Sequence, residues 1–447
     1  MRRLVMALAV AAATLMPAAP AVAAPADFTA TEVSFTSNDG VVLHGTVLAP
    51  ASGGAARRPG IVMLEGAGNR GRSYLRPEAE AYARHGVVTL IYDKRTEGYS
   101  AVHRDFSLLA DDALAGLRLL RDRPDVDPSH LGLWALSEGA WVAPLAANRS
   151  ADVRFLITVG AVGITPAAQT AWAYGTYLRH AGVSGSLPRT MRGTVVQTTI
   201  DLGIFAESDF DALPAWQQVR QPVLNQWGQL DRDALPGLSS RLIGGALDRG
   251  GNTSHTIRIV DGTNHNLHRT AADGFDRLPD LPADYADFET AWIADPSLTA
   301  PSASLADEPA PPVFAAGDHA WVSSGVVLAL LVAFAGFLVV GRRSKLGRPA
   351  RWLAVLTPVT LVATYLYLMF LLVVAAKVTG PVVLGRPLPW LLLQLLALAT
   401  VAATVAVAAT WRHHLDLTTP GRIRLALLTA TGALFAVWAV QWGLLLP

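Results

Sequence analysis

Four long apolar runs fill the C-terminal part of the chain and constrain its fold more than any other feature. They cover about residues 321–340, 352–376, 389–411 and 425–446. Each has about the 20 residues that a helix needs to cross the hydrocarbon core of a bilayer. Charged residues make up only 16% of the chain, against about a quarter in average soluble domains. We therefore expect residues 321–447 to form a region of four transmembrane helices.

The loops between these runs predict the orientation of the helices. The first loop holds Arg342, Arg343, Lys345, Arg348 and Arg351, and the third holds Arg412, Arg422 and Arg424. The second loop has only Lys377 and Arg386. Since loops rich in Lys and Arg stay in the cytoplasm, the first and third loops are predicted to lie inside. The domain before the first span is then expected outside the cytoplasm.

The N-terminal residues predict export independently of the loops. Arg2 and Arg3 precede an apolar stretch, 4–15, that is too short to span a bilayer, and the small-residue pattern Ala-Val-Ala follows at 21–23. This layout predicts a signal peptide over residues 1–24, with an uncleaved anchor as the alternative. Both signals predict a multi-pass cell-membrane protein with its globular domain on the extracytoplasmic side.

The overall composition excludes several kinds of site. The 36 basic and 35 acidic residues give a formal net charge of +1, which offers no reason to expect a nucleic-acid partner. The chain has no cysteine, so disulfides, thiolate metal sites and a cysteine nucleophile are excluded. His44, His103, His255 and His268 lack the spacing of metal ligands. We expect neither a metal nor a cofactor.

Strand and helix signals alternate over about residues 25–297. Strands are expected at 32–36, 41–49, 60–64, 87–92, 130–136, 155–159, 222–226 and 256–260, and helices at 77–85, 108–121 and 138–147. Continuous apolar strands joined by helical crossovers predict an α/β fold, with a mostly parallel sheet covered on both faces. Residues 165–218 interrupt the alternation and are expected to form a helical cap over the carboxyl edge of the sheet. Residues 298–320, rich in Pro and Ala, predict an exposed linker.

Ser137 lies in Ala-Leu-Ser-Glu-Gly, between a predicted strand and a predicted helix. A serine on such a sharp turn is held at the edge of the sheet with a helix N-terminus behind it. Gly139 supplies the small residue that the turn needs after the serine, whereas Ala135 replaces the usual first glycine. On this motif alone, a helix-capping serine is the alternative.

Two later loops supply the partners that a nucleophilic serine requires. Asp231 follows the predicted strand 222–226, and His265 follows the predicted strand 256–260. A carboxylate can orient an imidazole and stabilise its charged form, and the imidazole can act as a general base. A capping aspartate and an exposed loop histidine are the alternatives. Serine, aspartate and histidine in this order, each after a predicted strand, predict a catalytic triad.

A loop of small residues, Glu65-Gly66-Ala67-Gly68, follows the predicted strand 60–64. An oxyanion needs two main-chain donors, and we expect them to be the amides of Ala67 and Glu138. A plain glycine turn is the alternative, and a phosphate loop is improbable because the Gly-Lys-Ser/Thr ending is absent. A substrate pocket is expected at Gly66 and at three aromatic residues of the cap, with packing of the cap's own core as the alternative for the aromatics. These three are Trp172, Tyr174 and Tyr177.

Together these segments resemble the α/β-hydrolase superfamily, in the branch of bacterial esterases, monoacylglycerol lipases and serine aminopeptidases. Residues 65–68 resemble its His-Gly-x-Gly oxyanion loop, with Glu65 in place of histidine. Residues 92–100 resemble its Asp-x-Arg-Gly-x-Gly-x-Ser segment, with Thr96 in place of the first glycine. The resemblance covers about residues 27–297 and implies the α/β-hydrolase fold and a serine hydrolase.

The expected function is therefore that of a membrane-anchored serine hydrolase that cleaves carboxylic esters through an acyl-enzyme. The expected partners are a small-molecule ester, an acyl lipid or a peptide, and the lipid bilayer through the four helices. A serine aminopeptidase or amidase of the same fold is one alternative. An exported binding or sensor module without catalytic activity is the other.

Overall fold

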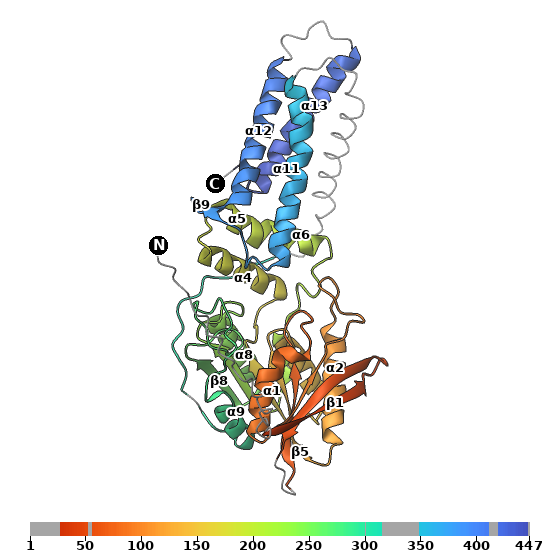
Figure 1. The fold of residues 1–447 in the computed structure, drawn as a ribbon, viewed down its shortest axis with the longest axis vertical. Coiled ribbons are helices and arrows are strands. Elements are labelled where there is room, and N and C mark those ends of the chain that lie inside the picture. Colours follow the sequence, from red (N-terminus) through yellow and green to blue (C-terminus); the bar gives the residue numbers. More distant parts are fainter. Residues whose placement is uncertain (1–26, 52–55, 300, 315–347, 411–418, 446–447) are drawn as a thin grey trace, which may run out of the picture.

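The computed structural model describes residues 27–51, 56–299, 301–314, 348–410 and 419–445. The expected signal peptide and the first apolar run lie outside the described residues. The described chain forms a sheet covered by helices and a bundle of long helices, with a layer of short helices between the two (Figure 1).

An eight-stranded sheet is the frame of the first part. Its strands are β1 (Phe28–Thr36), β2 (Val42–Pro50), β3 (Arg58–Leu64), β4 (Val88–Tyr92), β5 (Val126–Leu136), β6 (Phe155–Val159), β7 (Val223–Gly228) and β8 (His255–Val260). Their order in space is β1-β2-β4-β3-β5-β6-β7-β8. Strand β2 runs antiparallel to β1 and β4, and the other neighbouring strands are parallel. The expected α/β fold with a mostly parallel sheet is confirmed.

Helices cover both faces of this sheet, and successive strand residues serve opposite faces. The helices are α1 (Arg76–Arg84), α2 (Phe106–Arg121), α3 (Gly139–Arg149), α8 (Pro236–Gly250) and α9 (Tyr285–Ala294). On β3, Val62 and Leu64 join the core under α2, α3 and α8, while Ile61 and Met63 join the core under α1 and α9. Alternate side chains of a strand point to opposite faces of the sheet. Because helices cover both faces, the side chains on each face are apolar.

Helices α8 and α9 are not among the helices expected from the sequence. The sequence of α8 contains four glycines, which weaken helix propensity, and α9 has only ten residues. Helix α2 begins at Phe106, two residues before its expected start. Its capping residue is Asp105, whose carboxylate accepts the amides of Ser107 and Leu108.

The expected cap is helical and consists of α4 (Pro166–His180), α5 (Ser186–Arg189), η2 (Thr190–Val195), α6 (Val196–Asp201) and α7 (Leu213–Gln218). Helices α4, α5 and α6 lie between the sheet and the bundle (Figure 1). Helix α7 belongs to the core of the sheet domain, because its Trp216 is fully buried in the same cluster as α3 and α8.

The bundle contains α11 (Arg348–Val373), α12 (Leu388–Thr410) and α13 (Thr419–Gln441). Within the described residues, these three helices are long and apolar enough to cross a membrane. Large apolar side chains such as Leu366, Val405 and Val437 remain exposed on their outer faces. In a soluble protein such a surface would be unfavourable, whereas in a bilayer it faces lipid.

The cap and the bundle share one apolar core. Leu178, Leu187 and Met191 of the cap are buried in the same cluster as Trp390 and Trp442 of the bundle. Polar contacts join the same surfaces. The Ser184 amide donates to the Gly385 carbonyl at 2.8 Å, and the Thr190 hydroxyl donates to the Trp442 carbonyl at 3.1 Å. The sheet domain is therefore held against one end of the bundle through the cap.

Residues 301–314, the described part of the expected exposed linker, are half exposed but fixed to the sheet domain. The Ala303 amide donates at 3.0 Å to the carbonyl of Ile259 in the edge strand β8. The Glu308 carboxylate accepts the amides of Gly237 and Leu238 at the N-terminus of α8, where a negative charge is favoured. This segment is held in place along its length rather than acting as a free tether.

The buried carboxyl group of Glu289 in α9 makes the stability of the fold depend on pH. It accepts a hydrogen bond from the Gln226 side-chain amide, and burial raises its pKa from 4.5 to about 7. The folded state therefore holds this proton more tightly than the unfolded state. The stabilisation is present below pH 4.5 and is lost as the pH rises towards 7, a change of roughly 3 kcal/mol.

We expect Glu289→Gln to reduce the fall in thermal unfolding midpoint of the detergent-solubilised protein between pH 5 and pH 8. Glu80→Gln, at an exposed ion pair on α1, is the control and should follow the wild type. Equal pH slopes in all three proteins would contradict the assignment.

Candidate active site

Ser137 occupies a strained turn between β5 and α3. Its φ is +53°, in the left-handed region that costs a non-glycine residue about 1–2 kcal/mol. The turn is tight because α3 starts directly over β3: a Cβ on Gly139 would lie 2.8 Å from the Leu64 carbonyl oxygen. The methyl group of Ala135 is fully buried in the core, so this departure from glycine fits the structure. A strained serine at the end of a strand is typical of a nucleophile.

Asp231 and His265 meet at the carboxyl ends of β7 and β8. The His265 Nδ1 lies 2.8 Å from the Asp231 Oδ2, and the Asp231 side chain is fully buried. The other oxygen, Oδ1, accepts the amides of Asp233 and Ala234, which fixes the carboxylate. Because Nδ1 is engaged by the carboxylate, Nε2 is the nitrogen available to accept a proton.

The loop that carries His265 is anchored on both sides. The Asn264 side chain accepts the amides of Asn266 and His268, and the buried His268 ring contacts the Glu78 carboxylate at 2.8 Å. Gly160, after β6, leaves room for the ring, since a Cβ there would lie 2.5 Å from the His265 Cε1. These contacts hold His265 in one position. No sequence motif had indicated that the residues which make them support the histidine.

The electrostatic surroundings of His265 favour its charged form. Burial acts to lower the pKa of its imidazole, but the Asp231 carboxylate, through its charge and its hydrogen bond, raises the pKa above the ordinary value. A general base that receives a proton during the reaction benefits from this stabilisation.

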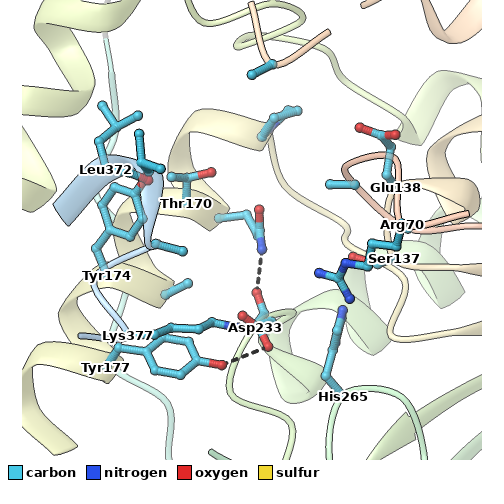
Figure 2. A pocket seen from close by; sticks show the side chains of 18 of the residues that line it. Arg70, Ser137, Glu138, Thr170, Tyr174, Tyr177, Asp233, His265, Leu372 and Lys377 are labelled. Carbon is cyan, nitrogen blue, oxygen red and sulfur yellow. Dashed lines mark hydrogen bonds between the residues drawn. The ribbon is translucent and has the colours of Figure 1, made fainter. Parts of the chain in front are cut away.

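Ser137 and His265 line the same cavity, and in Figure 2 the His265 ring points towards Ser137 and Arg70. The described residues include no hydrogen bond between Ser137 and His265. Such contacts are often long without substrate and shorten when the substrate binds. The structure thus brings the three predicted residues to one edge of the sheet, with the aspartate–histidine contact formed.

The predicted oxyanion donors also reach this cavity. Ala67 and Glu138 line it, and within the described chain neither amide donates to another group. Gly66 lies against the serine, because a Cβ there would be 3.3 Å from the Ser137 Cβ. Two uncommitted amides on either side of the nucleophile can hold a developing oxyanion.

A buried charged cluster supports both donors. The Lys94 side chain, 6% exposed, donates to the Gly66 carbonyl and to the Glu138 carboxylate, the latter at 2.8 Å. The Tyr99 hydroxyl donates to Glu138 at 2.7 Å and accepts the Gly68 amide at 3.0 Å. Lys94 and Tyr99 therefore hold the oxyanion loop and the serine turn together. Sequence reasoning missed both residues, although they lie in the segment 92–100 that resembles the hydrolase pattern.

Glu65, which replaces the usual histidine, has a structural role in the loop. Its carboxylate accepts the Arg70 amide at 2.9 Å and closes the loop, and burial raises the pKa of the carboxyl group.

The cavity has a volume of about 860 Å³ and is built from three parts of the chain. The sheet domain supplies the residues described above, the cap supplies Tyr174 and Tyr177, and the end of α11 supplies Leu372 and Val373. Figure 2 shows Leu372 facing the cavity across from Ser137. A contribution of one of the long apolar helices to the wall of this cavity was not expected.

The prediction for Trp172 is wrong. This side chain does not line the cavity but packs against Ala173 and Leu235 and donates to the Pro309 carbonyl at 3.1 Å. The residues of α4 that line the cavity are Pro166, Gln169, Thr170, Ala173, Tyr174 and Tyr177, which lie on one face of the helix. Position 172 points away from this face.

Asp231, Asp233 and His265 bring ligand-type atoms within 4.8 Å of one another. Both oxygens of Asp231 are already occupied by His265 and by main-chain amides, and Asp233 accepts the Tyr177 hydroxyl at 3.1 Å. These bonds hold the Asp231 carboxylate against the imidazole, which is the arrangement of an aspartate–histidine pair.

No protein-family model matches the chain. Over 135 residues, 29% of its length, the chain is 30% identical to a thiohydrolase of Aspergillus aculeatus, and over 135 residues it is 29% identical to a polyketide transferase of Penicillium crustosum. These matches cover 41% and 44% of the two relatives, so the chain spans less than half the length of the curated relatives it matches.

Among solved structures, dipeptidyl peptidase 4 of Porphyromonas gingivalis is similar with a TM-score of 0.42 and 14% identity. That match covers 60% of this chain and 35% of the peptidase. The fold follows from the structure of the chain itself. The strand order, the antiparallel pairing of β2 and the tight turn between β5 and α3 give residues 28–294 the α/β-hydrolase fold.

Proposed function

We propose that the protein is a serine hydrolase that cleaves carboxylic esters through a triad of Ser137, His265 and Asp231. The observation that carries this proposal is the buried Asp231–His265 pair, which shares a cavity with a strained serine and two uncommitted amides. Each feature alone has a structural explanation, but their convergence matches the needs of acyl transfer.

The reaction proceeds in two steps. The Ser137 Oγ attacks the ester carbonyl while His265 Nε2 takes its proton, and the carbonyl oxygen becomes an oxyanion held by the Ala67 and Glu138 amides. When this intermediate collapses, the C–O bond to the alcohol breaks and His265 protonates the leaving oxygen. Water then attacks the acyl-enzyme by the same route, releasing the acid and restoring the serine. Asp231 orients the imidazole and stabilises its charge throughout.

A serine aminopeptidase is the second candidate of this fold. A free amino terminus needs a carboxylate, and four acidic residues line the cavity: Glu65, Glu138, Asp233 and Asp276. Glu138 is paired with Lys94 and Arg104, whereas Asp233 accepts the Tyr177 hydroxyl. Thioesters react by the same chemistry, and the names of the thiohydrolase relatives make them a second substrate class worth testing.

We further propose that this domain lies outside the cytoplasm. The loop after α11 and the end of α13 contact the cap, so both lie on the same side of the bundle as the hydrolase domain. The ends of α11 and α13 that carry Arg351, Arg422 and Arg424 lie at the opposite side (Figure 1). Basic residues on the far side support a cytoplasmic location for that side.

A fluorophosphonate probe tests the nucleophile and separates an enzyme from an inactive binding module. We expect labelling of the wild type that disappears in Ser137→Ala, and ester turnover that falls by roughly 10³-fold or more in His265→Ala. Ser129→Ala, at an exposed serine, is the control. A folded wild-type protein without labelling would favour the binding module.

The pH profile of kcat/KM tests the pairing of Asp231 with His265. Because the carboxylate raises the pKa of the histidine, activity should rise with pH through a value above about 6.5 and fall at lower pH, where the imidazole is protonated. In Asp231→Asn, burial remains without the carboxylate. The acid limb should then move to lower pH, with a rate loss of roughly 10³–10⁴-fold. Asp261→Asn, at an exposed turn, is the control, and an unmoved limb in Asp231→Asn would remove Asp231 from this role.

Fusions to alkaline phosphatase test the location of the domain, since this reporter is active only outside the cytoplasm. A fusion after Ala316 should be active and one after Gly347 inactive. The reverse pattern would overturn the proposed orientation.

A further inference from the structure

The wall that α11 contributes to the cavity continues an apolar surface of the membrane span. Met369 and Val373 line the cavity. Leu366 lies three residues before Met369 and seven before Val373, which places all three side chains on one face of α11. Val373 is 74% exposed and Leu366 is 66% exposed. An unbroken apolar strip, formed by these three residues, therefore leads from the lipid-facing side of α11 into the cavity that contains Ser137.

Residues of the cap add further apolar side chains to the cavity wall. Val196 of α6, with Ile204 and Phe205 after it, lines the cavity, and Ile204 is partly exposed. These residues belong to the cap, which packs directly on the ends of the bundle helices. A cavity with apolar walls at the surface of a bilayer accommodates a long hydrocarbon chain better than a short polar substrate.

Two cationic side chains line the cavity without a carboxylate partner in the described part of the chain. Arg70 lies over the Tyr74 ring close to the nucleophile, and Lys377, just after α11, lies 4.6 Å from the centre of the Tyr177 ring. Arg104 and Arg277, by contrast, are paired with Glu138 and Glu78. Arg70 and Lys377 therefore each bring a positive charge to the cavity that no ion pair of the described residues neutralises. Lys377 and Arg70 are positioned to receive an anionic group near the scissile bond.

We propose that the substrate is an anionic acyl lipid of the bilayer, with its chain on the strip of α11 and its anionic group at Lys377. This inference rests on the proposed esterase function and names its substrate class. It makes the membrane helix a part of the binding site, so that the bundle supplies specificity as well as anchoring.

The test uses the full-length protein in detergent micelles that contain either phosphatidylglycerol or phosphatidylcholine with the same acyl chains, and measures released fatty acid. We expect the wild type to prefer phosphatidylglycerol by tenfold or more. In Lys377→Glu this preference should fall towards one. Arg386→Glu, which makes the same charge change on the same loop outside the cavity, should keep it. The ratio of the two rates is the readout, because a general loss of folding or catalysis lowers both rates alike.

A second pair of variants tests the strip. Val373→Trp should narrow the entrance and lower the ratio of long-chain to acetyl p-nitrophenyl ester turnover by about tenfold. Val359→Trp lies on the same exposed face about 20 Å along the helix and should leave that ratio as in the wild type. Equal ratios in both variants, or a wild type without preference for phosphatidylglycerol, would overturn the lipid inference. If the wild type also fails to turn over p-nitrophenyl acetate, the proposed esterase function itself falls.

Discussion

The apolar contact between the cap and the ends of the bundle helices determines how this protein is organised. Residues of α4, α5 and η2 are buried in the same cluster as Trp390, Trp438 and Trp442. Burial of such large side chains stabilises the contact by several kcal/mol, because each contributes about 1.5–3 kcal/mol when removed from water. The cavity of the hydrolase domain has its α11 wall only because this contact holds the helix end beside the sheet.

Within the hydrolase domain, a second level of support lies beneath the reacting groups. Lys94, Tyr99 and Glu138 form a buried cluster that joins the oxyanion loop to the serine turn. Buried charges are costly unless they are paired and hydrogen-bonded, and here the pairing coincides with the position of the two amide donors. Glu78 has the same role on the histidine side, where it contacts His268 and Arg277. The proposed catalytic residues are thus fixed by polar networks rather than by apolar packing alone.

These two levels connect the fold to the proposed chemistry. The parallel sheet collects the ends of β5, β7 and β8 at one edge, which is where the serine, the aspartate and the histidine lie. The cap and α11 then enclose that edge with apolar walls and two uncommitted cations. In the proposed function, this enclosure lets the substrate chain remain in contact with the membrane while the ester lies at Ser137.

The sequence by itself determined the features that depend on local patterns. Apolar strands followed by Ser137, Asp231 and His265 were enough to predict the sheet, the turn and the aspartate–histidine contact, because strand ends meet at one edge in a parallel sheet. The lengths of the apolar runs predicted the three described long helices in the same way. Helix α8 was missed because its glycines hide the helical pattern, and Trp172 was misplaced because the facing side of α4 depends on what packs against it.

Only the tertiary structure decided which distant segments share a surface. It placed Lys94 beneath the oxyanion loop, fixed Glu308 at the start of α8, and brought Lys377 and the end of α11 to the cavity of Ser137. No pattern within one segment encodes such contacts. They arise when apolar faces that are far apart in the chain bury each other, and a periodic pattern reveals that a face is apolar but not which partner covers it.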